Sequence, residues 1–152
     1  MNKNSEVRYK KFVFKTATKW IEDRKGKLLS SGKPTLQIST PPEFSGPSGY
    51  WSPEELFLCS INSCIMTTFL YFAEKFSLSF QSYESEVEGE VSFEEGRYLF
   101  SSIIVRPIIK VKSQKEEEKA KIAIEKSEKY CLISCSVKTK ITVIPKIQKA
   151  DR

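Results

Sequence analysis

The feature that most restricts the fold is a long apolar stretch, residues 56–72, preceded by a typical helix start. Ser52 is a favoured N-cap residue, and Pro53 suits the first helical position because its missing N–H would have no partner there. The two glutamates that follow complement the positive end of the helix dipole. These signals predict a helix from about Ser52 to Lys75. Because apolar residues occur nearly all round it, we expect this helix to be central and buried.

The same stretch has the length of a short membrane span, but it carries polar side chains in its middle. Their hydroxyl and amide groups would be costly to bury in lipid, which favours a core helix over a membrane-spanning one. We therefore expect no membrane partner. The polar side chains are Ser60, Asn62, Ser63, Thr67 and Thr68. No apolar segment resembling a signal peptide precedes them, and four cysteines in such a chain are typical of a reducing compartment. We therefore expect a cytoplasmic protein.

The part of the chain before this helix predicts strands. Residues 7–21 are rich in aromatic and β-branched side chains and predict one long strand, which a charged turn with Gly26 follows. Residues 28–40 predict two short strands around a turn at residues 31–34. The residues rich in Pro, Gly and Ser at 41–53 predict an ordered loop that leads into the helix.

A hairpin is predicted after the helix. In residues 83–93, glutamates on one face alternate with residues on the other face that include Val91 and Phe93. This pattern is typical of a strand with one solvent-exposed face. A turn at residues 94–97 leads into a return strand at 98–111. Pro107 in that strand indicates an edge position or a bulge, because proline cannot donate to a ladder.

A second helix and a last strand complete the pattern. Ser113 and Glu116 match a capping box, and the helix that follows is expected to end near Tyr130 and Cys131. Residues 137–145 alternate again and predict the final strand. Because the strands come in hairpins and not in βαβ units, the fold class is α+β with mainly antiparallel sheets.

Length and composition are those of one globular domain. A chain of 152 residues with 39% hydrophobic and 29% charged residues can bury a modest core. We expect a single domain over residues 1–152, with frayed tails at 1–6 and 147–152. The net charge of +6 comes mostly from lysines mixed with glutamates. Since no arginine cluster or nucleic-acid motif accompanies it, this charge indicates a solvated surface and no nucleic-acid partner.

The candidate reactive side chains are four cysteines: Cys59, Cys64, Cys131 and Cys135. Their spacings differ from the CX2C pairs of structural zinc sites, and Cys59 and Cys64 point about 140° apart on a helix. We therefore expect no metal site. Burial in the core is an alternative for all four, and it is the interpretation we prefer for Cys59. The polar neighbours of Cys64 favour a reactive thiol there.

The chain contains no histidine, which excludes Cys–His and Ser–His–Asp catalysis. A thiolate in this chain must be stabilised by an arginine, a lysine or a helix N-terminus. Because arginine keeps its charge at neutral pH, it stabilises a thiolate but does not act as a base. The composition therefore favours chemistry that needs only a nucleophilic thiolate.

Taken together, these segments resemble the OsmC/Ohr family of organic-hydroperoxide-reducing proteins, from about Phe12 to Pro145. The matching features are TATKWIEDRKGK near the start, LQISTPPEFSGPSG before the helix, Ser52-Pro53-Glu54, Cys64 ten residues after Glu54, and Cys131 at the end of the second helix. The resemblance implies an OsmC-like fold that forms an intertwined homodimer with its sites at the interface.

The resemblance also implies a thiol-dependent peroxidase. Cys64 would attack an organic hydroperoxide, and Cys131 would convert the sulfenic acid into a Cys64–Cys131 disulfide, which an external dithiol reduces. Arg24 matches the arginine that holds the thiolate, and Glu54 matches the carboxylate that fixes this arginine. No metal, haem or flavin is needed. A non-catalytic protein of the same fold that carries a small apolar ligand is the alternative.

Two further expectations concern the site. Ten residues of straight helix span about 15 Å, so either the start of the helix is bent back or Glu54 serves the site of the partner subunit. Aromatic residues flank the predicted entrance and would favour alkyl or acyl hydroperoxides; these are Phe44, Tyr50, Trp51 and Phe57. The sequence departs from the family pattern in Leu132, where proline usually follows the second cysteine, and in the additional Cys59 and Cys135.

Overall fold

The computed structural model describes residues 9–150, which divide into two compact units. The first unit ends at Pro53 and the second begins at Glu54, and each is described by itself. The expected single domain stays a prediction. The expected frayed residues 1–6, and the last two residues of the expected tail at 147–152, lie outside the described part. Residues 147–149 lie in a strand, which corrects the expected fraying there.

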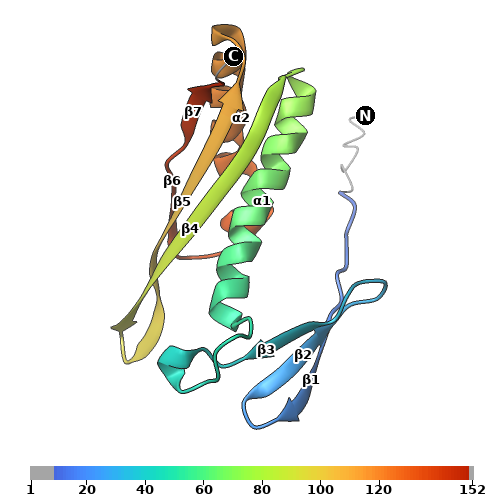
Figure 1. The fold of residues 1–152 in the computed structure, drawn as a ribbon, viewed down its shortest axis with the longest axis vertical. Coiled ribbons are helices and arrows are strands. Elements are labelled where there is room, and N and C mark those ends of the chain that lie inside the picture. Colours follow the sequence, from blue (N-terminus) through green and yellow to red (C-terminus); the bar gives the residue numbers. More distant parts are fainter. Residues whose placement is uncertain (1–8, 151–152) are drawn as a thin grey trace, which may run out of the picture. The chain divides into compact units, whose positions relative to one another are not determined.

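The first unit contains a three-stranded antiparallel sheet in the order β1–β2–β3 (Figure 1). The strands are β1 (Ala17–Glu22), β2 (Lys25–Leu29) and β3 (Leu36–Ser39). The two short strands expected around the turn at 31–34 are thereby confirmed. The loop after β3 is ordered, as expected, and holds a short 3-10 helix, η1 (Pro42–Phe44).

The predicted strand over residues 7–21 is wrong for most of its length. Residues 9–16 form no strand, and residues 7 and 8 lie outside the described part. The physical reason is the lack of a strand partner: Ala17 pairs with Leu29, where β2 ends, so no strand of the described part pairs with residues 9–16. A strand sequence that has no neighbour to pair with gains little from its β-propensity.

Gly26 lies inside β2 and not in the charged turn that the sequence predicts. The turn between β1 and β2 is formed by Asp23 and Arg24, and Asp23 has a φ of 42°. A Cβ on Gly26 would lie 3.1 Å from the carbonyl oxygen of Lys19. The glycine therefore permits the close approach of β1 and β2.

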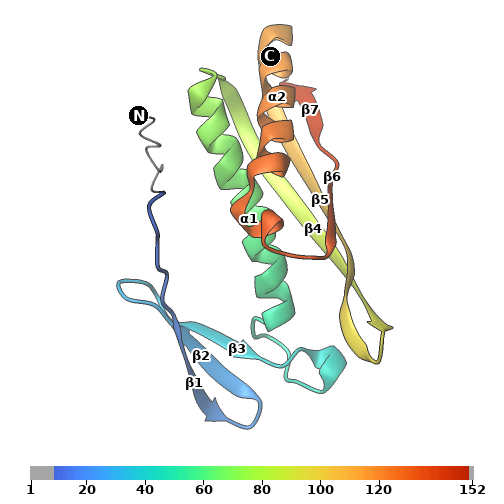
Figure 2. The same ribbon diagram turned by 180° about the vertical axis from the view of Figure 1, so that it is seen from behind.

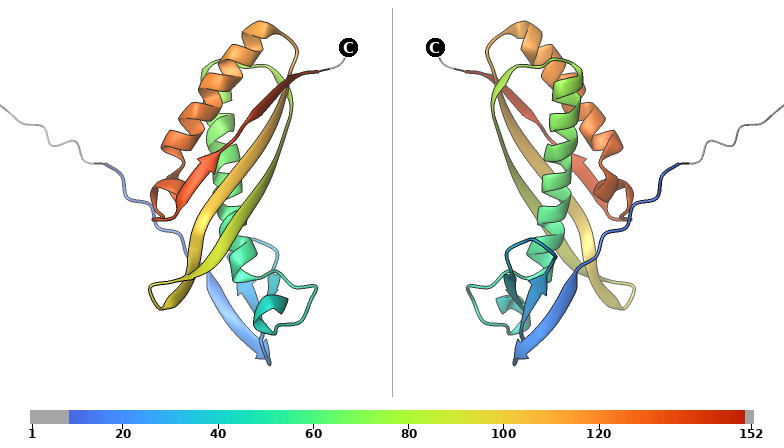
Figure 3. Two further views of the ribbon diagram at one scale, coloured as in Figure 1. Left: turned by 90° about the vertical axis from the view of Figure 1, so that its left-hand side faces the viewer. Right: turned by 90° about the vertical axis from the view of Figure 1, so that its right-hand side faces the viewer.

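The second unit packs its helices against one sheet. The elements are α1 (Pro53–Lys75), β4 (Phe80–Glu94), β5 (Arg97–Val111), α2 (Gln114–Tyr130), α3 (Leu132–Cys135), β6 (Lys140–Val143) and β7 (Lys146–Lys149). β4 and β5 form the antiparallel hairpin, while β6 and β7 pair with β5 in parallel. α1 and α2 lie over the same face of this sheet (Figures 2 and 3). The α+β class is confirmed.

The core forms where α1, α2 and β5 meet. Its fully buried members include Ile61, Ile65 and Phe69 of α1, and Ile103 and Ile109 of β5. The predicted start of α1 at Pro53 and its end at Lys75 are both confirmed. The predicted N-cap of α2 is confirmed as well, since the Ser113 hydroxyl accepts a hydrogen bond from the N–H of Glu116.

Pro107 lies in a central strand, which corrects its expected edge or bulge position. β6 pairs with β5 as far as Val105, and β7 pairs with it again from Ile108. Pro107 falls in the gap between these two parallel partners, opposite Ser85 of β4. Its missing N–H therefore removes no bond from either parallel ladder.

The alternation of β4 changes at a bulge near its end. The glutamates of β4 are exposed and the facing residues are half-buried as far as Gly89. The register shifts between Glu90 and Val91, after which Val91 and Phe93 are both exposed. These two residues therefore do not continue the buried face that the pattern predicts.

Tyr83 on the inner face of β4 provides a pH-dependent prediction. Burial raises the pKa of its phenol to about 12, which outweighs the opposing effect of the Ser85 side chain. The folded state then favours the protonated phenol, so this contribution to stability is complete below pH 10 and is lost between pH 10 and 12. The difference in tyrosinate absorbance between the wild-type chain and Tyr83→Phe reports Tyr83 alone. This difference should develop near pH 12. Its appearance near pH 10 would contradict the predicted burial effect.

α1 buries one face on the core, and its opposite face is exposed in the single chain. The exposed residues on that face include Cys59, Ser63, Thr67, Leu70 and Tyr71. Among the described residues, α1 is the one helix whose length and apolar composition would suffice to cross a membrane. Core helices of soluble proteins share these two properties, and α1 contributes Ile61, Ile65 and Phe69 to the core.

Candidate active site

The second unit brings two of the predicted site residues together, Cys64 of α1 and Cys131 at the end of α2. Cys131 is fully buried and Cys64 is half-buried, and both are free thiols. Burial raises the pKa of Cys131, and a hydrogen bond and charge interaction with Cys64 raise this pKa further. The two sulfurs therefore lie within interaction range, although the residues are 67 positions apart (131 − 64).

Ser134 supplies hydrogen bonds to the buried sulfur. Its N–H and its hydroxyl donate to Cys131 Sγ at 3.4 and 3.1 Å, and both bonds lower the pKa of Cys131 against the effect of burial. Cys131 ends α2, where its N–H donates to Ser127 O, and its sulfur then acts as the N-cap of α3. Ser134 was not among the predicted site residues. The signal that could have indicated it is its position three residues after Cys131, the usual spacing between an N-cap side chain and the N–H that donates to it.

The hydroxyl side chains around Cys64 bond to the helix itself, whereas the amide of Asn62 donates to Ser85 O of β4 at 3.2 Å. The hydroxyls of Thr67 and Thr68 donate to the carbonyl oxygen of Cys64 at 3.1 and 2.8 Å, and Ser63 donates to that of Cys59 at 2.7 Å. Hydroxyls that bond back to the preceding turn are common inside helices. The hydroxyls on which the expectation of a reactive thiol at Cys64 partly rests therefore bond within α1.

Glu54 lies in the first turn of α1 and does not reach Cys64 along the helix. α1 is one continuous helix over both residues, so about 15 Å of helix axis separates them. The Oε2 atom of Glu54 is buried and has no hydrogen-bond partner among residues 9–150. A buried carboxylate oxygen without a donor is costly, which makes this oxygen a suitable partner for a cation.

Arg24 belongs to the first unit, where it holds the turn between β1 and β2 to the loop after β3. Its Nη1 donates to the carbonyl oxygen of Phe44 at 2.8 Å. Its own carbonyl oxygen accepts from the Ser39 hydroxyl at 3.0 Å and from the N–H of Thr40 at 3.3 Å. The guanidinium is therefore presented on an anchored loop, and its role toward Cys64 stays a prediction.

The remaining two cysteines, Cys59 and Cys135, are both exposed. The preferred interpretation of Cys59 as a core residue is therefore wrong for the single chain, because it lies on the face of α1 that points away from the core. Among residues 9–150, no three side chains of the types His, Cys, Asp and Glu cluster as they would around a metal ion.

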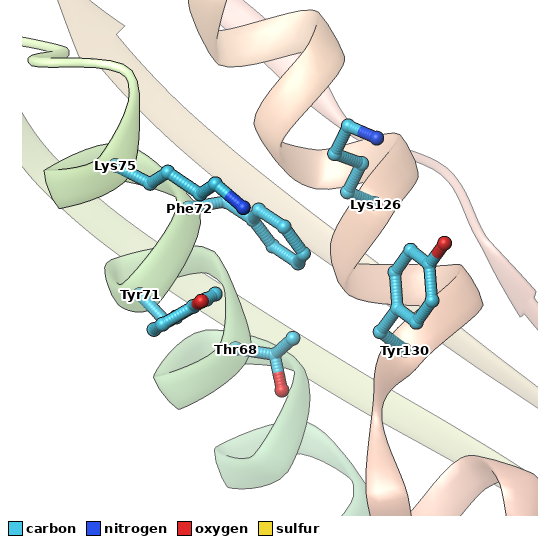
Figure 4. A pocket seen from close by; sticks show the side chains of 6 residues that line it. All are labelled: Thr68, Tyr71, Phe72, Lys75, Lys126 and Tyr130. Carbon is cyan, nitrogen blue, oxygen red and sulfur yellow. The ribbon is translucent and has the colours of Figure 1, made fainter. Parts of the chain in front are cut away.

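An aromatic and cationic groove runs between α1 and α2 (Figure 4). Its volume is about 420 Å³, and it is lined by Thr68, Tyr71, Phe72, Lys75, Lys126 and Tyr130. Thr68 bonds to Cys64, and Tyr130 directly precedes Cys131. This groove was not predicted. Phe57, one of the aromatic residues expected at an entrance, packs instead against Phe100 with ring centroids 5.1 Å apart.

Comparison with known proteins identifies the family. Residues 46–146 match the family model described as OsmC-like protein, which is about two thirds of the chain. The chain belongs to the OsmC-like family. A sequence relative is the uncharacterized protein YmaD of Bacillus subtilis, 28% identical over 112 residues, with 72% of this chain and 75% of the relative covered.

Solved structures confirm the expected OsmC-like fold. An OsmC-like protein of unknown function from Vibrio cholerae matches with a TM-score of 0.79 and 18% identity over 89% of this chain and 99% of that one. An organic hydroperoxide resistance protein OsmC from Legionella pneumophila matches at 0.71 and 19% identity over 91% and 99%. One from Elizabethkingia anophelis matches at 0.73 and 16% identity over 94% and 100%. At these identities the likeness concerns the fold.

Proposed function

We propose that this OsmC-like protein is a thiol-dependent peroxidase that reduces organic hydroperoxides. The observation that carries the proposal is the interaction of Cys64 with Cys131, two free thiols that the fold brings together from separate helices. Two adjacent thiols can lose two electrons together and form a disulfide. The name "organic hydroperoxide resistance protein", carried by structural neighbours, supports the choice of substrate class.

The proposed reaction needs no cofactor. The Cys64 thiolate attacks the distal oxygen of the hydroperoxide, the O–O bond breaks, and the alkoxide takes up a proton and leaves as the alcohol. Cys64 is then a sulfenic acid. The Cys131 thiolate attacks the sulfenic sulfur, the S–O bond breaks, the hydroxide takes up a proton and leaves as water, and the Cys64–Cys131 disulfide forms. An external dithiol reduces this disulfide by exchange, as expected for a cytoplasmic protein.

Arg24 and Glu54 have supporting roles in the proposal. With no histidine in the chain, the Arg24 guanidinium stabilises the thiolate, and Glu54 holds the guanidinium in place. The buried, unpartnered Oε2 atom of Glu54 supports this pairing. The separation of Glu54 from Cys64 along α1 favours an intertwined homodimer, in which Glu54 serves the partner's site. The exposed face of α1 is a suitable surface for that contact.

Arg24→Met tests the role of the guanidinium. We expect it to lower kcat/KM for cumene hydroperoxide about a hundredfold, the usual cost of removing one donor that stabilises charge in an active site. Lys19→Met, which removes a cation from the neighbouring strand β1, should have little effect. Equal activities of the two variants would contradict the proposed role of Arg24.

A second candidate function is the binding of a small apolar ligand without catalysis. The groove of about 420 Å³ between α1 and α2 favours it, because three of its six lining residues are aromatic. In that case the thiols would be incidental.

Thiol counting with and without cumene hydroperoxide distinguishes the two functions. A peroxidase should lose at least two thiols for each chain treated with peroxide, and the same peroxide should appear as the alcohol. A binding protein should keep all four thiols on the same timescale. Retention of Cys64 and Cys131 as thiols in the presence of excess hydroperoxide would overturn the peroxidase proposal.

A further inference from the structure

The proposed disulfide would form at a sulfur that solvent does not reach. Cys131 has no exposed surface, and its Sγ is enclosed by Cys64 and by both donors of Ser134. Thiol–disulfide exchange requires an in-line approach of the attacking thiolate to one of the two sulfurs. A large external dithiol is therefore hindered at the Cys131 end of this disulfide.

A third cysteine lies at the surface, one helical turn from the buried sulfur. Cys135 is exposed and ends α3, the helix that Cys131 caps. The N–H of Cys135 donates to the carbonyl oxygen of Cys131 at 3.0 Å. Cys131 caps this single turn and Cys135 ends it, so about 6 Å of helix axis separates the two residues. This spacing lies inside the range of about 4.4–6.8 Å between Cα atoms that a disulfide bridges.

The orientation and surroundings of Cys135 also suit exchange. Its Sγ lies 3.4 Å from the carbonyl oxygen of Lys129, two residues before Cys131, so the side chain points back toward the end of α2. A groove of about 170 Å³ beside it is lined by Glu128, Ser134, Thr139 and Ile141. α3 is a single turn, so little regular structure is lost when the two sulfurs approach each other.

We propose that Cys135 is a relay thiol that carries the disulfide from the interior to the surface. The Cys135 thiol loses its proton, and its thiolate attacks Cys131 Sγ of the Cys64–Cys131 disulfide. The bond between Cys64 and Cys131 breaks, its electron pair leaves with Cys64 as a thiolate, and a Cys131–Cys135 disulfide forms. Oxidation is conserved in this step, and the proton goes to solvent. This relay rests on the proposed peroxidase function.

Ser134 serves the last step of the relay. The external dithiol attacks the exposed sulfur of Cys135, so Cys131 leaves as a thiolate. The N–H and hydroxyl of Ser134 already point at this sulfur and stabilise its negative charge. A stabilised thiolate is a better leaving group, which speeds the exchange.

The relay predicts the number of peroxide molecules consumed without reductant. Because it returns Cys64 to the thiolate, the wild-type chain should consume two equivalents of cumene hydroperoxide. The first yields the Cys131–Cys135 disulfide, and the second yields a Cys64 sulfenic acid that dimedone traps. Cys135→Ser should consume one equivalent and stop at the Cys64–Cys131 disulfide. Cys59→Ser, a matched change at the other exposed cysteine, should still consume two.

Peptide mapping identifies the linkage directly. In the oxidised wild-type chain, residues 130–138 should carry an internal disulfide and be lighter by two hydrogens, while the Cys64 peptide carries dimedone. A stoichiometry of one in both the wild-type chain and Cys135→Ser, with Cys64 linked to Cys131 in each, would overturn the relay but leave the peroxidase intact. Failure of the peroxidase itself would appear differently, as a wild-type chain that consumes no peroxide.

Oxidation by diamide tests the relay without any peroxidase activity. Diamide converts thiol pairs to disulfides directly, so the oxidised wild-type chain should again contain the internal disulfide of residues 130–138. Cys135→Ala, a second variant at this exposed position, should yield only the Cys64–Cys131 linkage. Finding that linkage alone in the diamide-treated wild-type chain would contradict the relay.

Discussion

Replacing Cys64 by serine is expected to abolish hydroperoxide consumption. The serine hydroxyl is not ionised at neutral pH and cannot accept an oxygen atom as a thiolate does, so the first step of the reaction is lost. A decrease of at least a thousandfold in kcat/KM for cumene hydroperoxide is expected, which corresponds to about 4 kcal/mol of transition-state stabilisation. The measurement is the rate of cumyl alcohol formation with excess dithiothreitol.

Cys59→Ser is the matched control for this prediction. Cys59 lies five residues earlier on the same helix but on its exposed face, so its replacement should leave the rate within about twofold of wild type. Wild-type turnover in both variants would remove Cys64 from the mechanism. A loss of turnover in both would point to a general effect on α1.

Phe69→Ala is expected to cause the largest loss of stability. Phe69 is fully buried, and its ring packs at 5.4 Å from that of Phe80 and at 5.1 Å from that of Tyr83. Truncating a buried phenylalanine removes its burial free energy and leaves a cavity, at a typical cost of 3–5 kcal/mol. Urea unfolding at fixed protein concentration should show this decrease in the free energy of unfolding.

Ile122→Ala provides the comparison on the other helix. Ile122 is 48% exposed on α2, and alanine has the higher helix propensity, so the change should stay within about 0.5 kcal/mol. A loss at Phe69→Ala no larger than at Ile122→Ala would show that the α1–β4 contact is not central to the fold.

The helices could be predicted because their signals are local. Pro53 marks the start of α1, and the Ser113 hydroxyl caps α2 within three residues of chain. Even there, one detail depends on the tertiary structure: the carboxylate of Glu116 accepts a hydrogen bond from Ser79 N–H at 2.6 Å. A capping box would use that carboxylate at the N–H of Ser113. The sequence of α2 alone does not predict this distant partner.

The strands were harder to predict because pairing decides them. Residues 9–16 have the composition of a strand but no neighbour, whereas Lys146–Lys149 form β7 where the sequence suggested a frayed end. β7 forms because it pairs with Ile108 and the following residues of β5, nearly 40 positions away in the sequence. Strand propensity depends on how well a segment packs against neighbouring strands, and a local sequence pattern does not show which strands these are.

The candidate site was predicted in part. The resemblance selected Cys64 and Cys131, and the fold brings them together. An apolar helix of nearly uniform composition does not indicate which face the single chain buries, so the exposure of Cys59 was missed. Ser134 was missed because its role arises only where α2 ends and α3 begins.

The position of β7 gives residues 146–150 a protective role. β7 covers the backbone of Ile108–Val111, and the N–H of Ala150 donates to Val111 O at the end of this pairing. Truncation before Lys146 would uncover an open edge that carries two fully buried side chains, Ile109 and Val111. Uncovered apolar edges recruit strands from other molecules, so such a truncated chain should form insoluble aggregates even though every cysteine is still present.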